Sequence, residues 1–172
     1  VVSDMIELID NLKKQGDSIG GLVECRVKNL PVGLGEPVFD KLDADISKAI
    51  MSIGATKGIE FGSGFEVVEK KGFENNDEMY IKNNTIKFRS NNSGGILGGI
   101  STGQDLIFRV AVKPTSSISK TQKTITKDKK ETKIKVKGRH DPCICPRIVP
   151  VIESMTAIVL VDHILRNKAQ CK

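Results

Sequence analysis

Aromatic side chains are scarce in this chain of 172 residues, which contains no Trp, one Tyr and six Phe. Proteins that hold single-stranded nucleic acid without sequence preference stack its bases on aromatic side chains, so the scarcity argues against such a platform. Long apolar runs are also lacking. Glu153, Asp162 and His163 interrupt the longest apolar stretch, and we therefore expect no membrane-spanning helix.

Residues that bind metals or form disulfides are few. The chain has two histidines and four cysteines, and no signal peptide opens it, so we expect reduced thiols and a cytoplasmic location. Cys143 and Cys145 are separated by one residue, whereas zinc sites usually have two to four residues between paired cysteines. Together with the sparse histidines His140 and His163, this spacing predicts no metal site.

Positive charge is concentrated in one segment. The formal net charge is +6, yet residues 113–139 hold nine Lys and one Arg against Asp128 and Glu131, a local charge of +8. A basic segment of this kind favours an anionic partner. The candidates are a nucleic acid, a phosphorylated metabolite and a cofactor that carries phosphate; the alternative is a solvated lysine-rich loop with no partner.

Glycines cluster in "SGGILGGISTGQ", Ser93 to Gln104. The spacing is GGxxGG and a strand pattern follows, so this is neither the dinucleotide fingerprint GxGxxG nor a P-loop, each of which opens a helix. One interpretation is a wide turn that leads into a strand. The other is a stretch of backbone that a flat ligand approaches closely, since glycine has no Cβ.

Periodicity in the remaining sequence predicts an α+β fold. Helical spacing of apolar residues predicts helices over 3–15, 38–53 and about 147–168. Alternation of apolar and polar residues predicts strands in "GLVECRVKNL", over 106–112 and in "TKIKVKG". "GIEFGSGFEVVE" is expected to be a strand with a glycine-rich bend, and "NNDEMYIKNNTIKFRSNN" to be mostly loop with a short hairpin.

Two irregular stretches carry candidate chemistry. "KPTSS", Lys113 to Ser117, combines a cation with three hydroxyls where a strand ends, so it is either a seat for a phosphate or a strand terminator built from Ser and Thr turns. "GRHDPCICPR" places Arg139 and Asp141 in a segment that Pro142 and Pro146 keep irregular. Arg139 could bind a phosphate and Asp141 could act as an acid or base; the alternative is a solvated loop.

Taken in order, four stretches resemble the carboxy-terminal half of chorismate synthases. They are "GEPVFDKLDADISKAIMSIGATKGIEFGSGF", "SGGILGGISTGQ", "KPTSSI" and "GRHDPCICPRIVPVIESMTAIVLVDHIL". The resemblance implies a β-α-β sandwich and a homotetramer in the cytoplasm. It also implies the last step of the shikimate pathway, in which phosphate is eliminated from 5-enolpyruvylshikimate 3-phosphate to give chorismate. The family requires reduced FMN, although the reaction has no net redox change.

The family pattern also implies roles for individual residues. Asp141 matches an aspartate near flavin N5 that assists proton transfer, which makes it the candidate catalytic residue. Because Gly54 has no side chain, any contact there would be made by the backbone. The positions that match flavin contacts are Gly54, Ala55, Gly98, Lys113, Pro114, Thr115, Ser116, Ser117 and Arg139.

Some family motifs lie outside this sequence. The amino-terminal half of the family carries a Gly-Glu-Ser-His-Gly motif and a second catalytic histidine, and neither His140 nor His163 matches these. The chain begins with Val1 rather than Met, so we expect residues 1–172 to be the carboxy-terminal portion of a longer enzyme, with a flexible basic segment at about 118–137. The alternatives are a non-catalytic module that binds flavin or another anion, and a basic domain that binds RNA.

Overall fold

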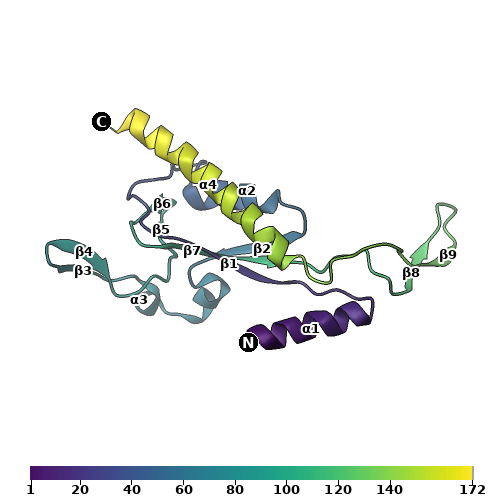
Figure 1. The fold of residues 1–172 in the computed structure, drawn as a ribbon. Coiled ribbons are helices and arrows are strands. Elements are labelled where there is room, and N and C mark those ends of the chain that lie inside the picture. The colour runs from purple at the N-terminus through teal and green to yellow at the C-terminus, as the bar shows by residue number, and fades with distance from the viewer. Residues whose placement is uncertain (172) are drawn as a thin grey trace.

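A three-stranded antiparallel sheet forms the centre of the computed structural model, which describes residues 1–171 (Figure 1). Strand β7 (Leu106–Val112) lies in the middle, between β1 (Gly21–Val27) and β2 (Thr56–Phe61). The two pairings are in register at the same end, since Gly21 and Thr56 both lie opposite Val112. One end of the sheet therefore holds the start of β1, the start of β2 and the end of β7.

Two helices cover one face of this sheet, as Figure 1 shows. Helix α2 (Leu42–Met51) packs against β2, and α4 (Cys145–Gln170) packs against β1 and α2. The alternate residues of β7 that face the helices are fully buried, whereas the opposite face carries the ion pair between Arg109 and Glu60 at 2.8 Å. Burial of apolar side chains between sheet and helices is the main source of stability here.

The predicted strands over 106–112 and in "GLVECRVKNL" are confirmed as β7 and β1. The predicted helix over 3–15 is α1 (Val2–Lys14), but it buries no residue and lies apart from α4, on the other side of the sheet (Figure 1). "GIEFGSGFEVVE" gives β2 followed by a turn of 3₁₀ helix, η1 (Gly64–Glu69), and α3 (Gly72–Asn75) comes next. The short hairpin in the Asn-rich stretch is β3 (Met79–Lys82) with β4 (Thr85–Phe88).

Two predicted elements differ from the structure. The helix expected over 38–53 begins only at Leu42, because Glu36 and Asp40 pair their backbones in both directions, at 2.7 and 3.1 Å, and so hold this stretch outside the helix. The strand expected in "TKIKVKG" is β9 (Glu131–Ile134), which ends earlier and pairs with β8 (Gln122–Ile125). This hairpin lies in the basic segment and projects away from the sheet (Figure 1); the flexibility of the segment stays a prediction.

Helix α4, predicted over about 147–168, has an exposed apolar surface. Its buried residues lie along the side that faces β1 and α2, while Ile158, Val161 and Leu165 are exposed on the other side. It is long and apolar enough to cross a membrane by length and composition. The central helix of a water-soluble fold meets the same criterion, so this property assigns no membrane role.

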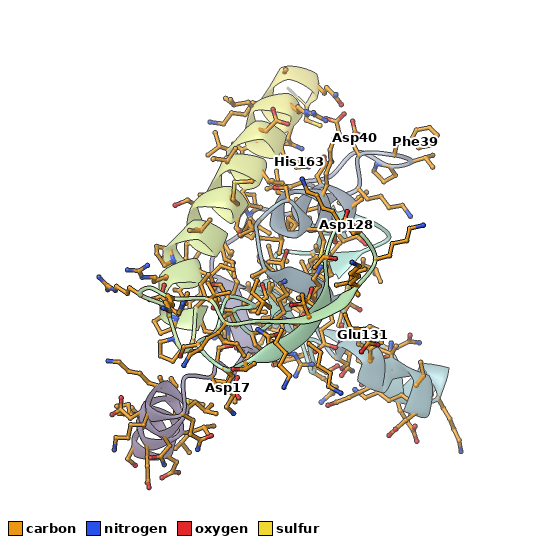
Figure 2. All side chains as sticks on the ribbon, turned by 90° about the vertical axis from the view of Figure 1, so that its right-hand side faces the viewer. Asp17, Phe39, Asp40, Asp128, Glu131 and His163 are labelled. Atoms are coloured by element: carbon orange, nitrogen blue, oxygen red, sulfur yellow. The ribbon has the colours of Figure 1, made fainter. Side chains whose placement is uncertain are left out.

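A buried polar contact joins the two covering helices. The side chain of His163 on α4 is 1% exposed, and its Nε2 lies 3.1 Å from Oδ2 of Asp45 on α2. Figure 2 shows His163 pointing from α4 toward α2. The contact satisfies one buried ring nitrogen and gives His163 a structural role between the two helices.

Replacing His163 with Ala should lower the free energy of unfolding of the full-length protein by about 2–4 kcal/mol, because the change leaves a cavity and removes the partner of Asp45. Chemical denaturation followed by circular dichroism measures this. Arg166→Ala on the exposed side of α4 is the control and should cost less than about 1 kcal/mol. Equal effects of the two changes would show that the contact does not join the helices.

Candidate active site

The two ends of the sheet differ in what surrounds them. We call the end with Gly21, Thr56 and Val112 the Val112 end, and the opposite end with Val27 and Leu106 the Leu106 end. At about 3.3 Å per residue, the seven residues of β7 separate the two ends by roughly 20 Å. Every predicted site residue except Gly98 belongs to the Val112 end.

The "KPTSS" loop leaves β7 at the Val112 end. The backbone N–H of Lys113 donates to the carbonyl of Ala55 at 2.9 Å, which places the loop beside the turn that follows α2. The hydroxyl of Ser18 donates to the carbonyl of Thr115 at 2.6 Å. These bonds attach the loop to two other segments, so Gly54, Ala55 and Lys113 to Ser117 share one location.

The "GRHDPCICPR" segment joins the same end through β1. The backbone N–H of Ile19, just before β1, donates to the carbonyl of Pro142 at 2.8 Å. Arg139 and Pro142 line a hollow of about 250 Å³ together with Gly16 and Ser119. The carboxylate of Asp141 accepts a hydrogen bond from Nη1 of Arg147 at 2.9 Å, which holds it at the start of α4.

One hydroxyl at the Val112 end lacks a partner. Oγ1 of Thr115 is buried, and within residues 1–171 it makes no hydrogen bond. An unsatisfied buried hydroxyl costs free energy unless water or a ligand completes it. At the same end of the sheet, a Cβ added at Gly54 would meet no atom within 4 Å, so that backbone is open to an approaching molecule.

Charges at this end favour an anion. Lys113, Arg139 and Arg147 are exposed cations, and α4 begins here with the positive end of its dipole. Nearby Asp17 is neutralised within the chain: hydrogen bonds from the Lys120 ammonium and the Ser18 backbone N–H hold the pKa of its carboxyl below the usual value. The Val112 end therefore offers the positive charge of Lys113 and Arg139, while Asp141 pairs with Arg147 and Asp17 pairs with Lys120.

The glycine cluster lies at the Leu106 end and contains the small hairpin of β5 (Ile96–Leu97) and β6 (Ile100–Ser101). All five glycines have a positive φ, which favours glycine, and four of the five are also closely approached by other parts of the chain. At Gly94 and Gly95 an added Cβ would strike backbone atoms, and at Gly99 and Gly103 it would strike the side chains of Lys41 and Val32. Only Gly98 faces open space. The wide-turn interpretation thus accounts for most of the cluster.

Gly98 is separated from the other predicted flavin contacts. The carbonyl of Gly99 accepts from the N–H of Leu42 at 2.9 Å, which places the hairpin at the start of α2, whereas Gly54 follows the end of that helix. A second and larger hollow, of about 940 Å³, lies at this end between the cluster and the β3–β4 hairpin. Within one chain, Gly98 and the "KPTSS" loop therefore do not share a pocket.

The two histidines considered as zinc ligands, His140 and His163, make other contacts. His163 pairs with Asp45 between the helices, and Nε2 of His140 lies 3.3 Å from the carbonyl of Val136. In the described part of the chain, no three His, Cys, Asp or Glu side chains are arranged to hold a metal ion.

Comparison with known proteins matches residues 1–165 to the family model described as chorismate synthase. This chain belongs to the chorismate synthase family. The chorismate synthase of Trichormus variabilis is 59% identical over 169 residues, and that of Prochlorococcus marinus strain MIT 9215 is 55% identical over 173 residues. These alignments cover 98% and 99% of this chain but 47% of each relative, so the chain spans about half the length of the curated relatives it matches.

A solved chorismate synthase structure has the same fold. It superposes with a TM-score of 0.77 at 32% identity, over 96% of this chain and 43% of the other. The family and the partial β-α-β sandwich expected from the sequence are thus confirmed. Chorismate synthases are lyases of aromatic amino acid biosynthesis, and this chain corresponds to less than half of such an enzyme.

Sequence reasoning did not identify two contacts at the Val112 end. Ser18 fixes the Thr115 carbonyl across 97 residues of chain, and no local pattern marks such a contact. Arg147 was visible in the "GRHDPCICPR" stretch, but its pairing with Asp141 follows from the first turn of α4, which brings two residues six positions apart into contact.

Cys145 lies in the first turn of α4, with its sulfur directed toward Gly21. Burial, together with the neighbouring Cys143 thiol, raises the pKa of Cys145 to about 11. Since the thiolate is the reactive form, iodoacetamide at pH 8 should label Cys145 far more slowly than exposed Cys171, and the rate should rise as the pH approaches 11. Mass spectrometry of labelled peptides measures both rates. Equal labelling at pH 8 would contradict the protected environment.

Proposed function

We propose that the full-length protein containing this chain is a chorismate synthase that eliminates phosphate from 5-enolpyruvylshikimate 3-phosphate, and that the Val112 end forms its flavin site. The observation that carries the proposal is the convergence of the "KPTSS" loop, the turn at Gly54 and Ala55, and the Arg139–Asp141 segment at one end of the sheet. These segments are separated by tens of residues in the sequence, so a shared binding site is a simple reason for their meeting.

The residues present fit a flavin phosphate. Oγ1 of Thr115 is a buried hydroxyl without a partner in residues 1–171, and a ligand oxygen would complete it. Lys113 and Arg139 would supply positive charge to a phosphate, with Ser116 and Ser117 as neutral donors and the ring of Pro114 keeping the loop extended. Gly54 and Ala55 would contact the cofactor through backbone. Reduced FMN, when bound, supplies transient electron donation to the substrate.

Asp141 would handle the proton of the reaction. Its carboxylate is partly exposed, pairs with Arg147, and belongs to the segment that Pro142 and Pro146 hold irregular. A carboxylate at a fixed position can accept a proton and return it without leaving the site. The chain's other task is to orient flavin against substrate and to exclude water, while the electron chemistry belongs to the cofactor.

The rest of the enzyme completes the site. We propose that the part of the protein outside this chain supplies the substrate-binding histidines, and that the enzyme is a homotetramer in the cytoplasm without nucleic acid or membrane partners. In such an assembly Gly98, which lies at the Leu106 end, would face a flavin. A non-catalytic module that binds flavin or another anion remains the second candidate, and the family assignment favours the enzyme.

Turnover by the full-length protein tests this proposal. Chorismate formation should require reduced FMN, and Asp141→Asn should lower kcat by about 10²-fold or more, because a general acid or base is lost. FMN affinity should change little, since the amide keeps the size of the carboxylate. Absence of chorismate formation by the wild-type protein would support the non-catalytic module, and unchanged turnover in Asp141→Asn would remove Asp141 from the mechanism.

Thr115→Val tests the flavin site without relying on turnover. The change removes the hydroxyl that has no partner in the chain, so FMN affinity should fall by roughly 2–12-fold while the protein is no less stable. Thr156→Val is the matched control. Its hydroxyl bonds the carbonyl of Ile152 at 2.7 Å inside α4, so it should affect stability and leave FMN affinity unchanged. Fluorescence titration of FMN and thermal unfolding measure the two effects; unaltered affinity in Thr115→Val would exclude Thr115 as a flavin contact.

A further inference from the structure

The carboxylate of Asp141 forms an ion pair with Arg147, a residue that is not among the candidate flavin contacts. Nη1 of Arg147 lies 2.9 Å from Oδ2 of Asp141. This is the only hydrogen bond that the Asp141 side chain makes within residues 1–171, so Oδ1 carries none. One carboxylate oxygen is held and the other is free.

Rigid elements hold both partners. The N–H of Arg147 donates to the carbonyl of Ile144 at 2.9 Å in the first turn of α4. Asp141 precedes Pro142, whose carbonyl accepts the N–H of Ile19 at 2.8 Å beside β1. The ion pair thus connects the start of the longest helix to a segment fixed against the sheet, and it determines where the carboxylate points.

Stability alone is a weak reason for this pair. The side chains of Arg147 and Asp141 are 65% and 31% exposed, and exposed ion pairs contribute little to the free energy of folding. Arg166 provides a comparison on the same helix. It pairs with Asp40 and Asp162, also at the surface, but near the Leu106 end and away from every candidate site residue except Gly98. Figure 2 shows Asp40 beside the far part of α4, close to His163.

We propose that Arg147 is a positioning residue for Asp141. This rests on the function proposed above. By holding Oδ2, the guanidinium selects one rotamer of the carboxylate and directs Oδ1 to the proton that it must accept and return. Arg147 takes no part in bond making or breaking. Without it, the Asp141 side chain rotates among its staggered positions and spends less time in the productive one.

A double-mutant cycle in the full-length protein tests this role. Arg147→Met should lower kcat by roughly 10–10²-fold with little change in the KM of the substrate or in FMN affinity, because misplacement of a catalytic group costs rate rather than binding. Arg147→Lys keeps one donor and should stay within about tenfold of wild type. In the Asp141→Asn background, Arg147→Met should have no further effect, since it acts through Asp141.

Two measurements separate positioning from folding. The Tm of Arg147→Met should shift by less than about 3 °C, as for Arg166→Met, which should keep wild-type kcat. The absorption spectrum of bound oxidised FMN should change similarly in Arg147→Met and in Asp141→Asn. The double variant should show no larger change than either single variant, and Arg166→Met should show no change. This second cycle applies even where turnover is too slow to measure.

The outcomes distinguish this inference from the proposed function. If the wild-type protein turns over substrate and the effects of Arg147→Met and Asp141→Asn add, in rate or in spectrum, the role of Arg147 is overturned and the proposed function is unaffected. An unchanged kcat in Arg147→Met would do the same. Loss of kcat accompanied by a large fall in Tm would assign Arg147 to folding. A wild-type protein that forms no chorismate would overturn both.

Discussion

Strand β7 separates the two ends of the molecule, because it pairs along its whole length with β1, pairs over Phe108 to Val112 with β2, and buries its alternate side chains beneath α2 and α4. Several segments that leave the sheet at the Val112 end are fixed there by hydrogen bonds. The hydrogen bond from Lys113 to Ala55 and the backbone bond from Ile19 to Pro142 tie loops from distant parts of the sequence to that end. The candidate site follows from this arrangement.

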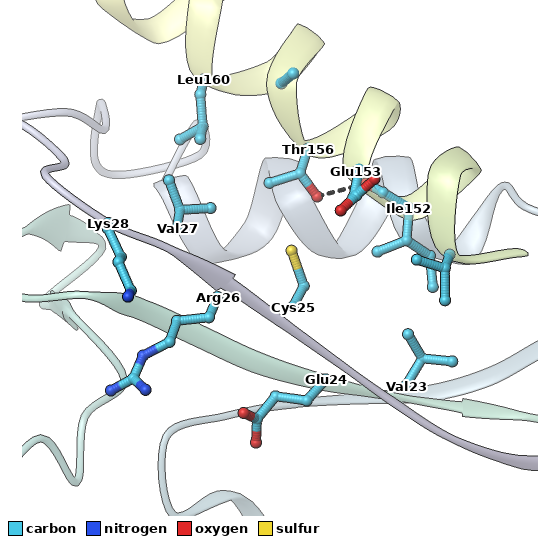
Figure 3. A pocket seen from close by; sticks show the side chains of 12 residues that line it. Val23, Glu24, Cys25, Arg26, Val27, Lys28, Ile152, Glu153, Thr156 and Leu160 are labelled. Carbon is cyan, nitrogen blue, oxygen red and sulfur yellow. Dashed lines mark hydrogen bonds between the residues drawn. The ribbon is translucent and has the colours of Figure 1, made fainter. Parts of the chain in front are cut away.

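The helices reinforce the same separation. Helix α4 starts at the Val112 end and crosses above β1, where Cys25 lies beneath Thr156 and a shallow cavity remains along the strand (Figure 3). Burial raises the pKa of the Cys25 thiol, so this cysteine behaves as a small apolar residue of the core rather than as a nucleophile. The contact of His163 with Asp45 fixes the far half of α4 against α2. The segment just before α4 is fixed beside β1 by the bond from Ile19 to Pro142, so Arg147 lies on a helix that is held at both ends.

Local patterns predicted most of the central fold. Alternation of apolar and polar residues was sufficient to predict β1 and β7. One face of each strand is buried and the other is not, so successive residues differ in polarity. Patterns failed where backbone bonds compete with periodicity. Residues 38–41 have apolar spacing suited to a helix, yet the bonds between Glu36 and Asp40 keep the chain outside α2. The strands of the β8–β9 hairpin expose nearly all of their residues. Without a buried face, their sequence shows little alternation of apolar and polar residues.

Residue types marked "KPTSS" and "GRHDPCICPR" as candidate chemistry, but only the resemblance indicated that they form one site, since the contacts between them are long-range. No sequence spacing predicts that Ser18 contacts Thr115. Nor does any spacing predict that the buried hydroxyl of Thr115 lacks a partner within residues 1–171. The glycine cluster was the most conspicuous motif, but four of its glycines are required by close approach of the chain to itself. Gly98 alone is open, and it lies at the Leu106 end.

The position of the cofactor tests the central claim most directly. A crystal structure of the full-length protein with bound FMN would measure the distances from the flavin to Thr115 and to Gly54. The account predicts a flavin at the Val112 end, with a ligand oxygen within hydrogen-bond distance of Thr115 Oγ1 and Asp141 facing the ring. A flavin held only at the Leu106 end, with Thr115 and Asp141 untouched, would contradict it.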